Sequence, residues 1–173
     1  MKKHSGFTLV ELLVVVAIVG LMMAFGIPAM GTFIKNDRLS TQINTLVGHL
    51  AYARSEAVTR GQQVALCASD NLTDCSGNDW AAGWILYVDA DGDSGFSVGE
   101  EILRVKQPLS GSNTLTGSLF DKNGNPAFIY DRRGFSATGT GTFSLCDDRG
   151  VTNMKSISIS NTGRVRQGGG AAC

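Results

Sequence analysis

The chain has 173 residues, which is the length of one domain and too short for several. Its 15 basic and 15 acidic side chains balance, so attraction of nucleic acid by a bulk positive field is excluded. The two histidines, at positions 4 and 49, are too few for a histidine metal cluster. Any function must therefore depend on local features of one small domain.

An apolar segment opens the chain. No residue from Leu12 to Ile34 carries a charge, and a helix of this length crosses the ~30 Å hydrocarbon core of a bilayer. Glu11 lies at the start of the apolar run. A carboxylate in such a helix costs about 2.5–3.5 kcal/mol at the centre and less toward the interface. A charge at this place is by default functional.

Three kinds of segment fit this start. A secretory signal peptide has a basic region before its apolar run and a cleavage site after it, and "KKH" followed by "AFG" fits loosely. An ordinary membrane anchor fits the length. In the third, processing takes place before the apolar run, between Gly6 and Phe7, so that the run stays in the mature protein. Glu11 has no role in the first two.

The residues at this junction carry a family resemblance. "GFTLVELLVVVAIVGLM" resembles the leader junction of type IV pilins and pseudopilins, matching it at Gly6, Phe7, Thr8, Leu9, Glu11, Leu12 and Leu13. The resemblance implies that a prepilin peptidase cuts after Gly6, which removes a leader of residues 1–6, and that it methylates Phe7. It also implies that Glu11 pairs with the Phe7 amine of the adjoining subunit. Residues 7–34 are then the transmembrane and assembly helix.

An amphipathic continuation of the helix is predicted over residues 35–60. Apolar residues recur there at intervals of three and four, which gives a stripe for packing against a sheet, at Leu39, Ile43, Leu46, Val47, Leu50, Ala51, Ala57 and Val58. Gly61 is the predicted stop, after Arg60 in the last turn.

The remaining residues, 61–173, predict a globular β-rich domain. Seven short segments bounded by Gly, Asn, Asp or Pro read as strands, at 62–68, 83–90, 100–109, 113–120, 126–131, 141–147 and 156–167. The fold class is therefore α+β. The resemblance implies a type IV pilin-like fold, in which a long N-terminal helix packs on a C-terminal antiparallel sheet.

The four cysteines all lie in the β-rich part, and none of their spacings is that of a zinc site. An even number in an exported domain predicts disulfides. Four cysteines allow three pairings, among which the sequence does not choose. We expect Cys67 to pair with Cys75 and Cys146 with Cys173, each bridge contributing on the order of 3 kcal/mol.

One loop resembles a calcium-binding pattern. In "DADGDSGFSVGE" the acidic residues Asp89, Asp91, Asp93 and Glu100 fall at the first, third, fifth and twelfth places, but Ser94 stands where the pattern has glycine. Strands also replace the usual flanking helices. We therefore expect a solvated hairpin turn, no metal and no cofactor. His4 lies in the leader and His49 on the helix, so no catalytic pair is evident and we expect no enzyme.

The motif "TGRVR" near the C-terminus carries the functional prediction. Arg164 and Arg166 should project from one face of a strand about 6–7 Å apart, which suits neighbouring phosphates. The spacing resembles the G-R-x-R signature of FimT-type minor pilins, which bind DNA during natural transformation. Gly163 belongs to the motif, and Lys155, Arg149, Arg132 and Arg133 are candidate neighbours.

Longer stretches support the same subfamily. "AYARSEAVTRG", "GWILYVDADGDSG" and "TGRVR" resemble the FimT/FimU/GspH group, which includes tip pilins and secretion pseudopilins. Loss of Lys2 and Lys3 with the leader leaves thirteen basic against fifteen acidic side chains. DNA binding would then depend on a local patch, with weak, sequence-independent and salt-dependent affinity.

Two functions remain open. In the first, the protein is a minor pilin that binds extracellular DNA for uptake during natural transformation. In the second, it is a structural minor pilin or pseudopilin of a tip complex that primes a type IV pilus or a type II secretion pseudopilus. Both imply the same partners, which are other pilins and the prepilin peptidase. Both also place the chain in the inner membrane as a single-pass protein before assembly and on the cell surface or in the periplasm afterwards.

Overall fold

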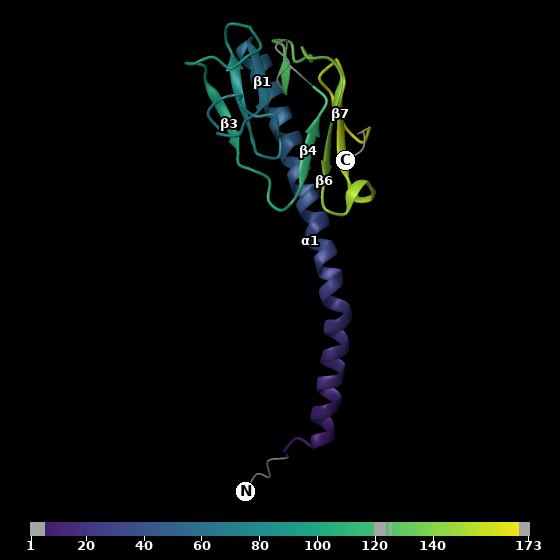
Figure 1. Ribbon diagram of the computed structural model, residues 1–173. Coiled ribbons are helices and arrows are strands. Elements are labelled where there is room, and N and C mark those ends of the chain that lie inside the picture. The colour runs from purple at the N-terminus through teal and green to yellow at the C-terminus, as the bar shows by residue number, and fades with distance from the viewer. Residues whose placement is uncertain (1–5, 120–123, 125, 170–173) are drawn as a thin grey trace. The chain divides into compact units, whose positions relative to one another are not determined.

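One long helix is followed by eight strands in the described part of the chain (Figure 1). The computed structural model describes residues 6–119, 124 and 126–169, with only the helical backbone of 25–29. The chain divides into two compact units, Met1–Asp37 and Arg38–Cys173. The predicted α+β class is confirmed.

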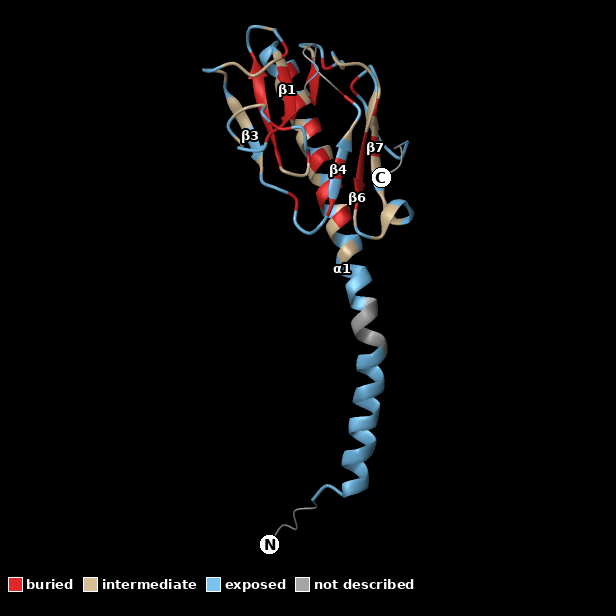
Figure 2. Ribbon diagram, viewed as in Figure 1, coloured by how far each residue is buried: buried red, intermediate tan, exposed pale blue. Residues whose placement is uncertain are grey.

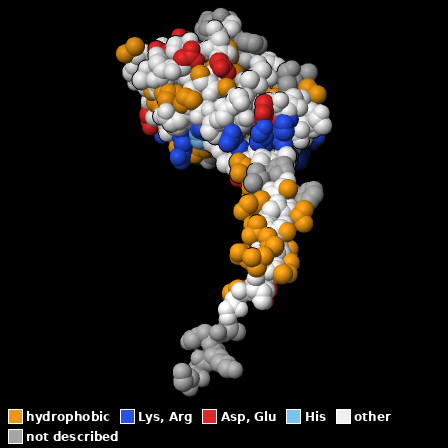
Figure 3. Space-filling view, turned by 60° about the horizontal axis from the view of Figure 1, so that its bottom comes forward, with side chains coloured by type: hydrophobic (Ala, Val, Ile, Leu, Met, Phe, Trp, Pro, Cys, Tyr) orange, Lys and Arg blue, Asp and Glu red, His pale blue; other side chains and the backbone are white. Residues whose placement is uncertain are grey.

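Helix α1 runs from Leu9 to Arg60. It ends where predicted, because Gly61 takes a left-handed φ of 66° while its amide still donates to the carbonyl of Ala57 at 3.0 Å. In the first unit the described side chains of α1 are almost all exposed and mostly apolar (Figures 2 and 3). Among the described residues, no helix has the length and hydropathy of a membrane span.

In the second unit, α1 buries one stripe of side chains against both sheets. The buried positions follow the helical period, at Leu39, Ile43, Leu46, Leu50, Ala53 and Ala57. The prediction was wrong for two residues of the stripe, since Ala51 and Val58 are exposed, and it missed the buried Ala53. Ala51 and Val58 are apolar, as a core residue would be, but they lie on the side of the helix next to the buried stripe.

The first sheet has the strand order β3-β2-β1-β5 and is antiparallel throughout. Its strands are β1 (Gln63–Ala68), β2 (Trp84–Asp89), β3 (Ile102–Lys106) and β5 (Ala127–Tyr130). The inner face packs on α1 in the main core. The outer face holds a second cluster, formed by Ala65, Cys67, Ile85, Tyr87, Ala127 and Ile129. The loops after β1 and β2 cover this cluster with Cys75 and Phe96.

The second sheet has the order β4-β6-β7-β8 and is also antiparallel. Its strands are β4 (Thr114–Gly117), β6 (Gly141–Cys146), β7 (Lys155–Ile159) and β8 (Val165–Gln167), and a short 3₁₀ helix, η1 (Gly150–Asn153), precedes β7. Phe143, Ile157 and Ile159 alternate into the core, as the pattern "ISIS" predicts. Serine and threonine occupy the alternate positions.

Each of the seven predicted strand segments contains a strand, and the predicted antiparallel β-sheet domain is confirmed. The last segment, 156–167, forms two strands, β7 and β8, joined by a turn. The strands also divide between two sheets. Strand partners depend on contacts between distant residues, which local patterns do not specify.

Candidate functional site

A groove of about 690 Å³ lies along the outer side of the second sheet. Six of its ten lining residues carry hydroxyl groups and two are arginines. They come from three strands and the adjoining turns, and are Ser118, Thr140, Gly141, Thr142, Ser158, Ile159, Ser160, Thr162, Arg164 and Arg166. The groove thus brings Arg164 and Arg166 together, as the sequence predicted, and adds hydroxyls that the prediction missed. Their alternation along the strands was the signal available in the sequence.

The turn between β7 and β8 sets the direction of both arginines. Gly163 has a φ of 74°, and a Cβ there would collide with the carbonyl oxygen of Gly134. Its own carbonyl accepts a hydrogen bond from the Tyr130 hydroxyl at 3.1 Å, and burial raises the pKa of Tyr130 to about 12. Gly163 is therefore buried and supports the turn, while Val165 points inward and Arg164 and Arg166 point outward.

The charges described in the groove have one sign. No carboxylate is among the described residues that line it. Within the described part of the chain, neither Arg164 nor Arg166 has a side-chain hydrogen bond or ion pair. Two exposed guanidinium groups beside neutral hydroxyl groups are a set of donors without acidic competitors. Such a set suits an anionic oxygen ligand.

The other predicted cations lie elsewhere. Lys155 pairs in register with buried Leu145, so it stands on the side of the sheet opposite to Arg166. Arg149 forms an ion pair with Asp147 at 2.6 Å. Arg132 and Arg133 line a separate hollow that also contains acidic residues, Asp89, Asp91 and Asp131. The structure thus reduces the predicted patch to two arginines.

The N-terminal prediction falls on an exposed helix start. Gly6 and Phe7 precede α1 and are exposed, whereas residues 1–5 of the predicted leader lie outside the described residues. The Glu11 carboxylate accepts hydrogen bonds from the Thr8 amide at 3.0 Å and the Thr8 hydroxyl at 3.2 Å. The Glu11 amide in turn donates to the Thr8 hydroxyl at 3.3 Å. This reciprocal arrangement is a capping box, which the spacing T-x-x-E could have revealed.

Comparisons with known proteins agree with this architecture. A family model described as "Type II transport protein GspH" matches residues 42–163, and the prokaryotic N-terminal methylation motif matches residues 1–27. The chain belongs to the GspH family. The FimT/FimU/GspH group that its motifs predicted is thus confirmed.

Solved structures of minor pilins share the fold. The type IV minor pilin FimU of Pseudomonas aeruginosa is 22% identical with a TM-score of 0.59, over 82% of this chain and 96% of that one. The minor pseudopilin EpsH of Vibrio cholerae is 12% identical with a TM-score of 0.51, over 75% and 95%. At these identities the likeness concerns the fold alone.

Curated relatives match over shorter stretches. The type IV major fimbrial protein FimA of Dichelobacter nodosus is 31% identical over 99 residues, which are 55% of this chain and 61% of FimA. The prepilin peptidase-dependent protein D of Escherichia coli is 40% identical over 47 residues, 27% of this chain and 32% of that protein. The chain thus spans less than two thirds of each of these relatives.

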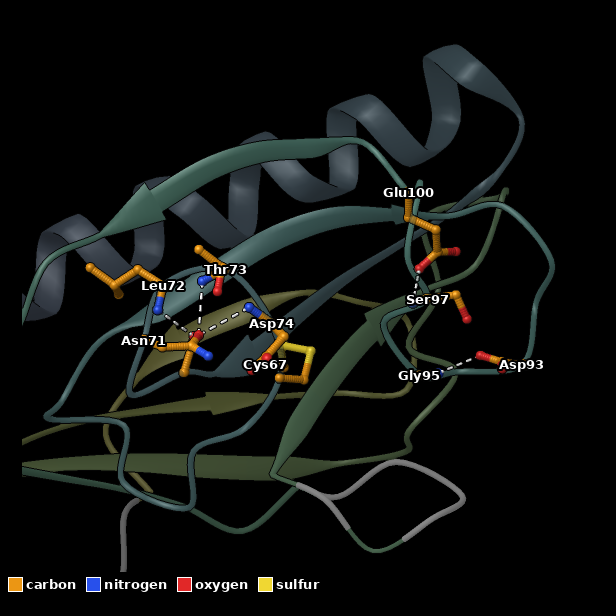
Figure 4. The surroundings of a disulfide bond; sticks show 11 residues. Cys67, Asn71, Leu72, Thr73, Asp74, Asp93, Gly95, Ser97 and Glu100 are labelled. Atoms are coloured by element: carbon orange, nitrogen blue, oxygen red, sulfur yellow. Dashed lines mark hydrogen bonds between the residues drawn. A yellow bond between two sulfur atoms is a disulfide. The ribbon is translucent and has the colours of Figure 1, made fainter.

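In this minor pilin the predicted Cys67–Cys75 disulfide is confirmed, with Cα atoms 5.6 Å apart. The loop that it closes is held by Asn71, whose side-chain oxygen accepts hydrogen bonds from the amides of Thr73 and Asp74 (Figure 4). Cys146 is also disulfide-bonded. Its predicted partner, Cys173, lies outside the described residues.

The acidic loop of the minor pilin differs from the solvated turn that we expected. Asp89 is only 2% exposed, and its two carboxylate oxygens accept from the amides of Gly92 and Ser94. Burial raises the pKa of Asp89. Ser94, which stands where the calcium pattern has glycine, adopts a left-handed φ of 73°.

The remaining acidic groups of this loop also bind its own backbone. Asp93 accepts from the Gly95 amide at 2.7 Å, and Glu100 accepts from Ser97 at 2.8 Å (Figure 4). Carboxylate oxygens of Asp89, Asp91 and Asp93 lie within 4.8 Å of one another. Each of these three carboxylates also accepts a hydrogen bond from a loop amide.

Proposed function

We propose that this minor pilin binds the phosphodiester backbone of extracellular DNA and draws it to the cell for uptake in natural transformation. The groove on the second sheet supports the proposal, since it combines two outward-pointing arginines with six hydroxyl-bearing residues. Arginine and hydroxyl groups are the donors that proteins commonly direct at phosphate oxygens. Because Arg164 and Arg166 lie together in one groove, a domain without net positive charge could still bind DNA locally.

The same proposal covers the route to the filament. The family and the methylation motif imply contacts with other pilins and with the prepilin peptidase. We propose cleavage after Gly6, methylation of Phe7 and insertion of residues 7–34 in the inner membrane. On assembly, the Glu11 carboxylate would replace its hydrogen bonds from Thr8 of the same chain with an ion pair to the Phe7 amine of the adjoining subunit. A desolvated carboxylate is best neutralised by an opposite charge.

The direct test is DNA binding by the Arg164→Ala/Arg166→Ala variant. We expect the wild type to bind any duplex weakly, with a log–log salt slope of roughly −2, and the variant to bind with a slope about two units shallower or not at all. Mobility shift at several salt concentrations measures this on the full chain in mild detergent. In cells, the variant should lose transformation and keep its pili.

The matched control is Arg132→Ala/Arg133→Ala. It removes the same charge from an exposed pair outside the groove. If both variants lose binding equally, only net charge matters and the groove has no special role. If the wild type does not bind DNA at low salt, the proposed DNA function is wrong.

A structural role is the second candidate, and the shared fold of FimU and EpsH favours it. In this role the chain joins a tip complex that primes a type IV pilus or a type II secretion pseudopilus. Deletion would then abolish pili or secretion. Replacement of Arg164 and Arg166 would leave both pili and secretion intact. Electron microscopy of pili and an assay of secreted protein distinguish this role from DNA capture.

A further inference from the structure

The hydroxyl groups of the groove form a row across the second sheet. Thr142 of β6 lies opposite Ser158 of β7, and Ser158 lies opposite Arg166 of β8. Ser118, just after β4, continues the row, since its amide donates to the Thr142 carbonyl at 3.0 Å. Neighbouring strands are about 4.8 Å apart, so the three side chains from Thr142 to Arg166 span about 10 Å. The row therefore runs perpendicular to the strands.

Groups in this row differ in charge and therefore in how they bind phosphate. Arg166 is a cation at one edge, and a phosphate that it neutralises releases counterions. Ser158 and Thr142 are neutral donors, which add hydrogen bonds without displacing salt. Ser158 has no side-chain hydrogen bond among the described residues, and the Thr142 hydroxyl lies 3.4 Å from the Ser118 hydroxyl. The Ser158 hydroxyl can thus turn toward a ligand, and the Thr142 hydroxyl can do so by giving up its long hydrogen bond to Ser118.

Among the residues that the structure describes, no aromatic side chain lines the groove. The nearest aromatic residue of this sheet, Phe143, is fully buried on the inner face against Trp80. Sites that hold single strands by their bases use exposed aromatic rings for stacking. The polar side chains described in this groove are two arginines and six hydroxyl-bearing residues, which can donate to phosphate and sugar oxygens, so the groove suits a backbone better than stacked bases.

We infer that one sugar-phosphate backbone lies across the strands in this groove, with one phosphate at Arg166 and the next held by Ser158 and Thr142. The inference rests on the proposed DNA function and adds two positioning residues and a ligand class to it. The ligand is the deoxyribose-phosphate chain itself, whatever bases it carries. Arg164, next along the same edge, extends the cationic end of the path.

The experiment compares Ser158→Ala/Thr142→Val with the wild type, using the full chain in mild detergent and a duplex at several salt concentrations. Two lost hydrogen bonds should weaken binding about five- to tenfold at every salt concentration. The salt slope should stay that of the wild type, because no charge is removed. In contrast, Arg164→Ala/Arg166→Ala should make the slope shallower by about two.

The control variant is Ser112→Ala/Thr152→Val. It makes the same chemical changes at exposed positions outside the groove. We expect its binding to equal that of the wild type. Thermal unfolding of each variant, followed by circular dichroism, confirms that the folds are equivalent.

A second probe is an abasic oligodeoxynucleotide, compared with a normal single strand of the same length. A backbone site should bind the two within about threefold, whereas a stacking site loses about five- to 150-fold in affinity per base. A large loss with the abasic strand would overturn the inference. The inference would also be overturned if the hydroxyl variant bound DNA as tightly as the wild type while the arginine variant failed to bind. The proposed DNA function would then stand, but without a role for the hydroxyl row. Absence of wild-type binding would instead overturn the DNA function and this inference together.

Discussion

The two sheets of this minor pilin share a strand count and an antiparallel arrangement but differ in their outer faces. In the first sheet β1, β2 and β5 are buried on both sides, because the disulfide loop and the acidic loop cover its outer cluster. The second sheet leaves its outer side to hydroxyls and two arginines. A face that must pack selects apolar side chains, so polar recognition is available only where side chains such as Arg164 and Arg166 stay exposed.

The largest effect should come from an outer-face core residue of the first sheet. Ile85 is fully buried there, and Ile85→Ala should cost about 3–4 kcal/mol through lost burial and a cavity. Ser158→Ala, at an outer-face position of the second sheet, should stay within about 0.5 kcal/mol. Both tryptophans, Trp80 and Trp84, are buried in the second unit, so urea unfolding followed by fluorescence reports on both variants. Equal costs would contradict the difference between the faces.

Removal of the disulfide that closes the loop over the outer face of the first sheet should have the next largest effect. The Cys67–Cys75 bridge closes a separation of eight residues, and Cys67→Ala/Cys75→Ala should cost about 2–3 kcal/mol by the loop-closure model. Loss of the bridge should also increase amide hydrogen exchange in the loop after β1 more than in β6 and β7. Uniform acceleration across both sheets would show that the bridge stabilises the whole unit and not the cover alone.

A smaller effect should appear with pH at His49, where α1 meets the first sheet. The Trp84 indole donates to His49 Nδ1 at 2.9 Å. Burial lowers the pKa of His49 below 6.5, and the nearby cations Arg104 and Lys106 act in the same direction. The unfolded chain therefore binds this proton more readily than the folded chain. The stabilisation is present above pH 6.5 and is lost as the pH falls through the lowered pKa.

The His49→Gln variant isolates this contribution, because glutamine accepts from Trp84 without titrating. Denaturant midpoints measured from pH 7.5 to pH 5 should fall more steeply for the wild type than for the variant. Asp89 titrates in both proteins, and its raised pKa contributes in the opposite direction, so it cancels in the difference. Parallel curves would show that protonation of His49 does not affect folding.

Much of the fold followed from local patterns in the sequence. The helix stop at Gly61, the seven strand segments and the alternation of Ile157 and Ile159 depend on residues close together in the chain. The predicted pair Cys67 and Cys75 is also close in sequence. In contrast, exposure of Ala51 and Val58, burial of Asp89 and separation into two sheets depend on what packs from elsewhere.

The sequence by itself determined the family motifs at the N-terminus, the α+β class and the outward direction of Arg164 and Arg166, because each is local to one helix start or one strand. Only the tertiary structure decided that Lys155, Arg149, Arg132 and Arg133 lie apart from the groove and that Thr142 and Ser158 align with Arg166. Strand register brings residues together that are distant in sequence. The composition of a surface therefore becomes visible only after the sheets have paired.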